Sequence, residues 1–116
     1  MIAVREGADS GATIIVPQAK LTLANAQEFL KAVHAIPTAM APNVIVDLEQ
    51  TRFVDSSGVG ALVNAMKHIQ AMNGTFALVG LRPAILRSFR LMNLHQVFDI
   101  YETEALARQL IRERRL

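Results

Sequence analysis

Cysteine is absent from the 116-residue sequence, which excludes disulfide bonds, thiolate catalysis and cysteine-ligated metal sites. Long hydrophobic runs are absent as well. The most apolar stretches, residues 39–46 and 76–81, are far shorter than the roughly 20 residues that span a bilayer. The first residues mix charged and apolar side chains, unlike the basic and then apolar order of a signal peptide. We therefore expect a cytoplasmic protein without a membrane partner.

An excess of charge of one sign is also missing. Twelve Lys and Arg against ten Asp and Glu give a formal net charge of +2. The basic residues form no continuous tract, so the charge does not favour nucleic-acid binding. Apolar residues are abundant, since 52% of the sequence is hydrophobic and 19% is charged. At this length, such a composition predicts one hydrophobic core and therefore a single domain over residues 1–116.

Short apolar runs mark the expected strands. Residues 2–5 and 13–16 are two such runs on either side of a turn-forming segment at residues 7–11, which predicts a β-hairpin. Residues 44–48 and 75–79 are almost continuously apolar, as in strands that are buried on both faces. We therefore place residues 44–48 in the middle of a sheet.

Helical spacing of apolar residues predicts four helices, which begin at Thr22, near Ser56, at Pro83 and at Thr103. A short last strand is expected at residues 97–101. Strand and helix then alternate after the initial hairpin. This order predicts an α/β fold in which a mixed sheet of four to five strands is covered by four helices.

The segment from Asp55 to Gly58 carries the strongest functional signal, because it lies at the start of a helix that follows a strand. Backbone N–H groups in such a first turn are unpaired, and they and the helix dipole stabilise a phosphate on a serine hydroxyl. Asp and Ser are also common N-caps, so these residues alone are equally consistent with a plain helix start. Gly58 and Gly60 weaken the helix by roughly 1 kcal/mol each, which favours close approach by another chain.

The string from Phe53 to Leu62, FVDSSGVGAL, resembles the signature of STAS-domain anti-sigma factor antagonists. The resemblance extends to the order of elements and covers almost the whole chain, which implies a single STAS domain over residues 1–116. It implies that Ser56 accepts a phosphate, with Ser57 as the fallback. The partner-binding residues that it implies are Asp55, Ser56, Ser57, Gly58, Gly60 and Thr22.

The resemblance implies that this protein takes part in a partner-switching cycle. The unphosphorylated protein binds a serine-kinase anti-sigma factor and releases the sigma factor. The kinase then phosphorylates the antagonist and switches binding off, and a PP2C-type phosphatase resets it. Many members carry an acidic residue in the loop after the second strand, where this chain has Thr22. We therefore expect kinase recognition or phosphorylation efficiency to differ from that of typical members.

The sequence lacks individual residues that the motifs of common enzyme classes require. Position 54 is Val, so Ser56 lacks the first glycine of a Gly-x-Ser-x-Gly nucleophile elbow. No Gly-Lys-Ser/Thr follows Gly58 and Gly60, so a P-loop is absent. We expect no enzyme activity, no catalytic residue, no small-molecule substrate and no cofactor. The alternative function is a non-enzymatic STAS scaffold, or a partner-switching module that controls a target other than a sigma factor.

Other polar and sulfur-containing residues have simpler interpretations. The histidines lack ligand spacing, so no metal site is expected: His34, His68 and His95. Three methionines lie in or beside apolar stripes and are predicted to fill the core: Met66, Met72 and Met92. The third helix carries arginines that suit either a basic partner-contacting surface or a solvated helix face: Arg82, Arg87 and Arg90.

Overall fold

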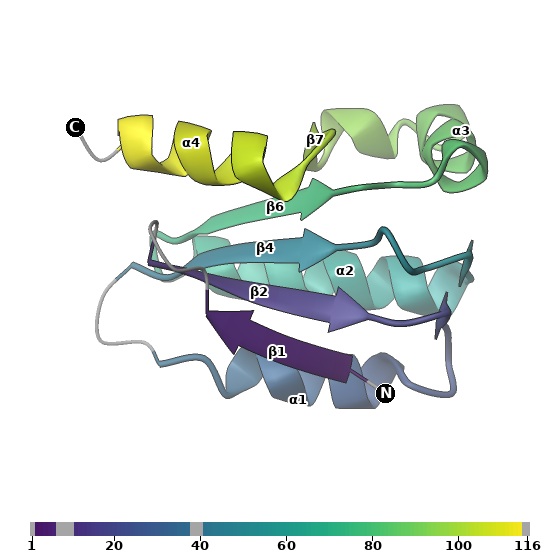
Figure 1. The fold of residues 1–116 in the computed structure, drawn as a ribbon. Coiled ribbons are helices and arrows are strands. Elements are labelled where there is room, and N and C mark those ends of the chain that lie inside the picture. Colours follow the sequence, from purple (N-terminus) through teal and green to yellow (C-terminus); the bar gives the residue numbers. More distant parts are fainter. Residues whose placement is uncertain (1, 7–10, 38–40, 115–116) are drawn as a thin grey trace.

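A five-stranded mixed sheet forms the centre of the computed structural model, which describes residues 2–6, 11–37 and 41–114. Its strands lie in the order β1 (Ile2–Glu6), β2 (Ala12–Pro17), β4 (Asn43–Asp47), β6 (Thr75–Val79) and β7 (Asp99–Tyr101) (Figure 1). β1 pairs with β2 in the antiparallel sense, and all other neighbours are parallel. The predicted mixed sheet, with residues 44–48 at its centre, is thus confirmed.

The expected hairpin is present as the pair of β1 and β2, in which Val4 lies opposite Ile15. Residues 7–10 of the expected turn lie outside the described residues. β2 is buried along its whole length, because β1 and β4 flank it and helices cover both faces of the sheet. This burial explains why its sequence is almost continuously apolar.

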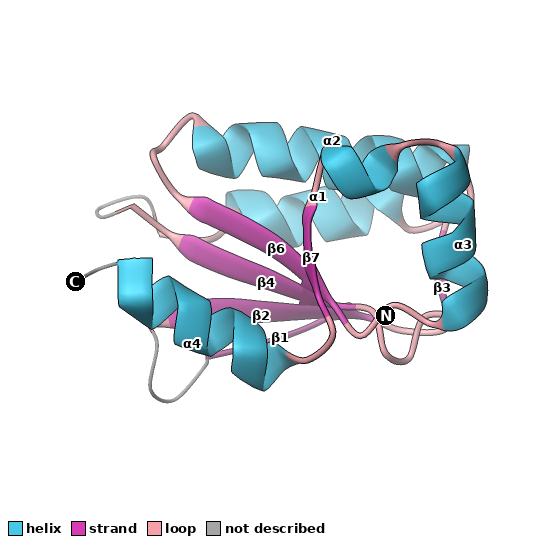
Figure 2. Ribbon diagram, turned by 90° about the horizontal axis from the view of Figure 1, so that it is seen from above, coloured by secondary structure: helices cyan, strands magenta, loops and turns pink. Residues whose placement is uncertain are grey.

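Four helices cover the sheet: α1 (Ala26–His34), α2 (Ser56–Gln70), α3 (Pro83–Leu91) and α4 (Glu104–Arg114). Figure 2 shows α1 and α2 over one face and α4 over the other, with α3 at the end where the parallel strands finish. The chain therefore has two apolar layers, one on each face of the sheet. No helix in the described part of the chain is both long and apolar enough to cross a membrane.

Alternate residues of β4 supply the two layers. Val44 and Val46 pack in the larger cluster, together with Phe29 of α1 and Leu62 of α2. Ile45 points to the other face and packs in the smaller cluster, which includes Ala107 and Ile111 of α4. The side-chain period of a strand thus distributes three fully buried residues between two layers.

The start of α1 differs from the prediction. The N-cap is Asn25 and not Thr22, so the helix begins at Ala26. Thr22 instead closes a separate turn: its carbonyl oxygen accepts from the backbone N–H groups of Asn25 (3.1 Å) and Ala26 (2.8 Å). The Asn25 side chain, which accepts from the Thr22 N–H at 2.9 Å, stabilises this turn and delays the helix by one turn.

Two other helix starts agree with the predictions. Pro83 occupies the first turn of α3, where its missing N–H costs nothing. Thr103 caps α4 by accepting from the N–H of Leu106 at 3.1 Å. Met92 was wrongly predicted to lie in the core. It is the C-cap of α3 and is 52% exposed, because Asn93 has a positive φ of 58° and ends the helical stripe.

The last strand is shorter than predicted. Residues 97–101 were expected to form it, whereas β7 spans only Asp99–Tyr101. A short 3-10 helix, η1 (Leu94–Gln96), precedes it. Phe98 between them is buried and packs against Phe76 and Phe89, so its apolar character reflects the core and not strand pairing.

A second, small sheet lies beside the main one. It consists of β3 (Lys20–Leu21) and β5 (Phe53–Val54), which pair in parallel. Just before β5, the buried hydroxyl of Thr51 donates to the carbonyl oxygen of Pro17 at 2.9 Å. This contact fixes the segment before β5 on the end of β2, and so positions the residues that follow β5.

Replacement of Thr51 by Val keeps the shape of the side chain but removes this donor from a buried site. We expect Thr51→Val to lower the free energy of unfolding by about 1–2 kcal/mol in guanidinium titrations. Thr13→Val is the matched control, because Thr13 is also buried but its hydroxyl has no hydrogen bond among the described residues. An equal loss in both variants would contradict the assigned role of the Thr51 hydroxyl.

Candidate functional site

Asp55 organises the start of α2. Its backbone is extended (φ −91°, ψ −176°), and its Oδ1 accepts from the N–H of Gly58 at 2.8 Å. The other oxygen, Oδ2, accepts from the N–H of Leu23 at 3.2 Å. A single carboxylate therefore caps α2 and also holds the loop that follows β3.

Ser56 and Ser57 are the first two residues of α2, directly after this cap. Ser56 is exposed, whereas Ser57 is half-buried. The carboxylate of Asp55 accepts a hydrogen bond from the N–H of Gly58. The backbone carbonyl oxygen of Asp55 accepts one from the N–H of Val59. The N–H groups of Ser56 and Ser57 have no acceptor within the described ranges. These free donors at a helix N-terminus create a local environment that favours an anion.

The loop of Thr22 lies against the start of α2. The N–H of Asp55 donates to the carbonyl oxygen of Leu21 at 3.3 Å, and Leu23 donates back to Asp55. Thr22 lies between these two contacts and is half-buried. Its hydroxyl oxygen accepts from the N–H of Ala24 at 3.2 Å, so the side chain is engaged within its own turn.

Gly58 has a different role from the one predicted. It is buried, and an added Cβ would lie 2.1 Å from the carbonyl oxygen of Leu21 and 2.9 Å from a methyl carbon of Val54. The close approach that requires a glycine here is therefore made by β3 of the same chain, and not by a partner. Gly60 differs from Gly58, because it is exposed and a Cβ there would meet nothing within 4 Å.

Two exposed apolar side chains near this site were not singled out from the sequence. Leu23 is 76% exposed and Phe53 is 54% exposed. The N–H of Leu23 is bound by Asp55, and Phe53 lies two residues before Asp55 in β5. Exposed large apolar residues beside a polar functional segment are typical of a protein–protein contact surface. Both residues lie next to turns, where core packing is not expected. This position is the feature of the sequence that could have indicated their exposure.

His34 and His68 meet on the surface of α1 and α2, although their separation in sequence gave no such indication. Their ring centroids are 4.2 Å apart and the rings are tilted by 33°. They line a shallow hollow of about 570 Å³ with Gly60, Val63, Asn64 and Lys67. In the part of the chain that the structure describes, no three potential ligands come close enough to hold a metal ion.

The arginines make different contacts in different parts of the structure. Arg82 donates from Nε to the carbonyl oxygen of Glu49 at 3.0 Å, so its guanidinium is fixed on a loop. Arg5 of β1 donates from both terminal nitrogens to the Glu104 carboxylate of α4. This hydrogen bonding raises the pKa of Arg5 above its ordinary value. Arg87 and Arg90 are exposed on α3.

The two glycines of α2 provide a matched test of this packing. We expect Gly58→Ala to lower the free energy of unfolding by about 1–3 kcal/mol or more, because backbone must move to admit the methyl group. Gly60→Ala is expected to stabilise the fold by about 0.5–1 kcal/mol, as alanine does in an open helix position. Thermal or chemical denaturation measures both changes. A neutral Gly58→Ala variant would contradict the contact with Leu21.

Comparisons with known proteins place the chain in a family. Residues 3–107 match the STAS domain. A Thermotoga maritima protein named "Putative anti-sigma factor antagonist" is 30% identical over 102 residues, which cover 87% of this chain and 90% of that protein. A crystal structure from the same organism, under the same description, has a TM-score of 0.84 at 27% identity and covers 96% of this chain and 94% of that one.

The fold also matches that of SpoIIAA, described as a Bacillus cell fate determinant and solved in its phosphorylated form. The TM-score is 0.68 at 20% identity, with 97% of this chain and all of that chain covered. At this identity the likeness concerns the fold alone. The match over residues 3–107 and the 30% identical relative show that the chain belongs to the STAS domain family.

Proposed function

We propose that this chain is an anti-sigma factor antagonist that acts in the cytoplasm as a single, non-enzymatic STAS domain over residues 1–116. Its unphosphorylated form binds a serine-kinase anti-sigma factor and releases the sigma factor. Phosphorylation of Ser56 switches this binding off, and a PP2C-type phosphatase restores it. The observation that carries the proposal is the exposed Ser56 at the start of α2, with unpaired backbone donors around it.

Exposure favours Ser56 over Ser57 as the phosphate acceptor. A kinase must bring the hydroxyl to its nucleotide, and the half-buried Ser57 would have to move first. Ser56 needs no such movement, because Asp55 already holds the first turn in place. The use of phosphorylation as the switch is supported by two names: one relative is a "Putative anti-sigma factor antagonist" of Thermotoga maritima, and SpoIIAA was solved in a phosphorylated form.

The proposed switch is electrostatic. The surface offered to the partner combines the small hydroxyl of Ser56 with the exposed apolar side chains of Leu23 and Phe53, and Gly60 leaves open space one turn further along α2. Phosphorylation adds about −1.5 to −2 charges at this surface. The helix N-terminus stabilises that charge within the free protein, whereas burial against a partner would strip its water. Binding should therefore be lost without unfolding.

The family resemblance implies an acidic residue in this loop in many members, and this chain carries Thr22 there. Its hydroxyl is engaged with Ala24, and it adds no negative charge next to Asp55. A phosphate on Ser56 would then meet one neighbouring carboxylate and not two. We infer that Thr22 tunes kinase recognition or the efficiency of phosphorylation, and does not determine whether Ser56 is used.

The first test is phosphate transfer with ATP, Mg²⁺ and candidate serine-kinase anti-sigma factors from the same genome, followed by site mapping by mass spectrometry. We expect phosphate on Ser56 in the parent and none on Ser56→Ala. Ser57→Ala, which removes the neighbouring hydroxyl, is the matched control and should keep its phosphate. Phosphate on Ser57 in the parent would contradict the assignment. No phosphate with any such kinase would favour a STAS scaffold.

The second test measures affinity for the kinase that phosphorylates the parent. We expect Ser56→Asp to weaken binding at least about tenfold in calorimetry, because one buried charge without a partner costs more than about 1.4 kcal/mol. Its melting temperature should stay near that of the parent, since Asp is favoured at a helix start. Ser88→Asp places the same charge at an exposed position of α3 and serves as the control. Equal weakening in both variants would contradict a local switch.

A further inference from the structure

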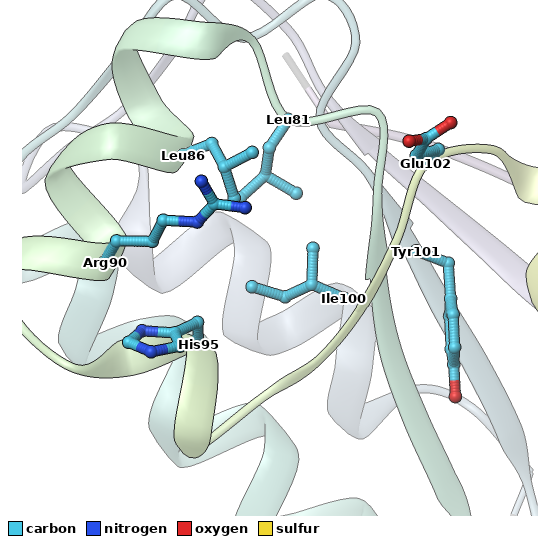
Figure 3. A pocket seen from close by; sticks show the side chains of 7 residues that line it. All are labelled: Leu81, Leu86, Arg90, His95, Ile100, Tyr101 and Glu102. Atoms are coloured by element: carbon cyan, nitrogen blue, oxygen red, sulfur yellow. The ribbon is translucent and has the colours of Figure 1, made fainter.

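A second cavity lies away from the start of α2, between α3, η1 and β7. Its volume is about 470 Å³, and it is lined by Leu81, Leu86, Arg90, His95, Ile100, Tyr101 and Glu102 (Figure 3). Volumes of about 300–1,000 Å³ are usual for sites that bind small organic molecules. None of these residues belongs to the proposed partner surface around Ser56.

The position of the cavity is one at which α/β sheets bind ligands. Leu81 follows the carboxyl end of β6, and Ile100 and Tyr101 lie in the neighbouring parallel strand β7. Crevices at the carboxyl ends of parallel strands are the usual ligand sites of open α/β sheets, because the connecting segments diverge there. In this chain, α3 and η1 form the connection between these two strands and wall the cavity on its outer side.

The cavity combines an apolar lining with positive charge. Figure 3 shows the guanidinium of Arg90 directed toward Leu86 and Leu81, with the ring of His95 on the opposite side of the Arg90 side chain. Ile100 completes the apolar part, and the carboxylate of Glu102 lies at the far rim. A charged group thus stands at the edge of an apolar surface, as in sites for amphipathic ligands.

Arg90 lines the cavity and has no ion-pair partner within the described residues. Arg5 and Arg108 pair with Glu104, and Arg82 donates to a backbone carbonyl. Arg87 lies one turn away on α3 and, with Arg90, lines an adjoining hollow. The guanidinium of Arg90 is therefore available to a ligand in the cavity, and no ion pair with Glu102 of the same lining occupies it.

We propose that this cavity binds a small amphipathic carboxylate. The carboxylate pairs with the guanidinium of Arg90, whose planar donors match carboxylate geometry. The hydrocarbon part covers Leu81, Leu86 and Ile100. The ligand is bound and not converted, and its site is separate from the phosphorylation of Ser56.

The test uses octanoate as the probe and ¹⁵N–¹H correlation spectra of the parent protein as the readout. Octanoate should cause saturable shifts centred on the amides of Leu81, Leu86 and Ile100. Octylamine carries the same chain with the opposite charge and should cause none there, and inorganic phosphate should cause no saturable shift in the cavity. Equal shifts with octylamine would overturn the charge requirement, and saturation by phosphate alone would overturn the amphipathic ligand class.

Two variants on one helix test the role of Arg90. Arg90→Gln should raise the dissociation constant for octanoate about tenfold, as expected for loss of one charge-assisted hydrogen-bonded contact. Arg87→Gln removes a charge from the adjoining hollow and should change it less than about twofold. Unchanged melting temperatures verify that both variants fold. Equal dissociation constants for parent and Arg90→Gln would overturn the proposal, as would the absence of saturable shifts in the parent.

Discussion

The carboxylate of Asp55 is the contact on which the surroundings of Ser56 depend. One oxygen binds an N–H in the first turn of α2, and the other binds the N–H of Leu23 in the loop after β3. These two segments are more than thirty residues apart in sequence. The bridge reinforces the pairing of the two-residue strands β3 and β5, which are too short to be stable in isolation.

Close packing beneath this bridge makes the arrangement rigid. Gly58 lets the helix rest on the carbonyl oxygen of Leu21, and Thr51 holds the preceding segment on Pro17. The site thus lies at the end of a sheet whose central strands are buried, while Ser56 itself remains exposed. A residue held on a rigid element offers the same geometry to each protein that acts on it. This property suits the proposed recognition of Ser56 by a kinase and then by a phosphatase.

Sequence periodicity was sufficient for most of the fold because β2, β4 and β6 are almost continuously apolar and the helices have apolar stripes. Periodicity did not predict the elements whose conformation is determined by local contacts. β3 and β5 have two residues each, which is too short for a periodic signal. The turn at Thr22 competes with a helix start through the side chain of Asn25. Propensity could not show that competition.

The sequence predicted the helix start at the candidate site but not the contacts that its residues make. The pattern Asp-Ser-Ser-Gly indicated a capped helix start, and Asp55 has that role. For Gly58, the sequence indicated a close approach but not its origin within the chain. The contact of His34 with His68 and the cavity beside Arg90 join residues from separate elements. Such features depend on how elements are packed, which the spacing of residues along one element does not contain.

The two outer strands of the main sheet have a consequence for self-association. An unpaired strand edge can recruit an edge of another molecule and begin aggregation. On one side the sheet ends at β7, whose three residues offer a very short template. On the other side it ends at β1, where Arg5 and Glu6 place charges along the edge. The chain can therefore present apolar residues to a regulatory partner while its sheet gives copies of itself little to extend.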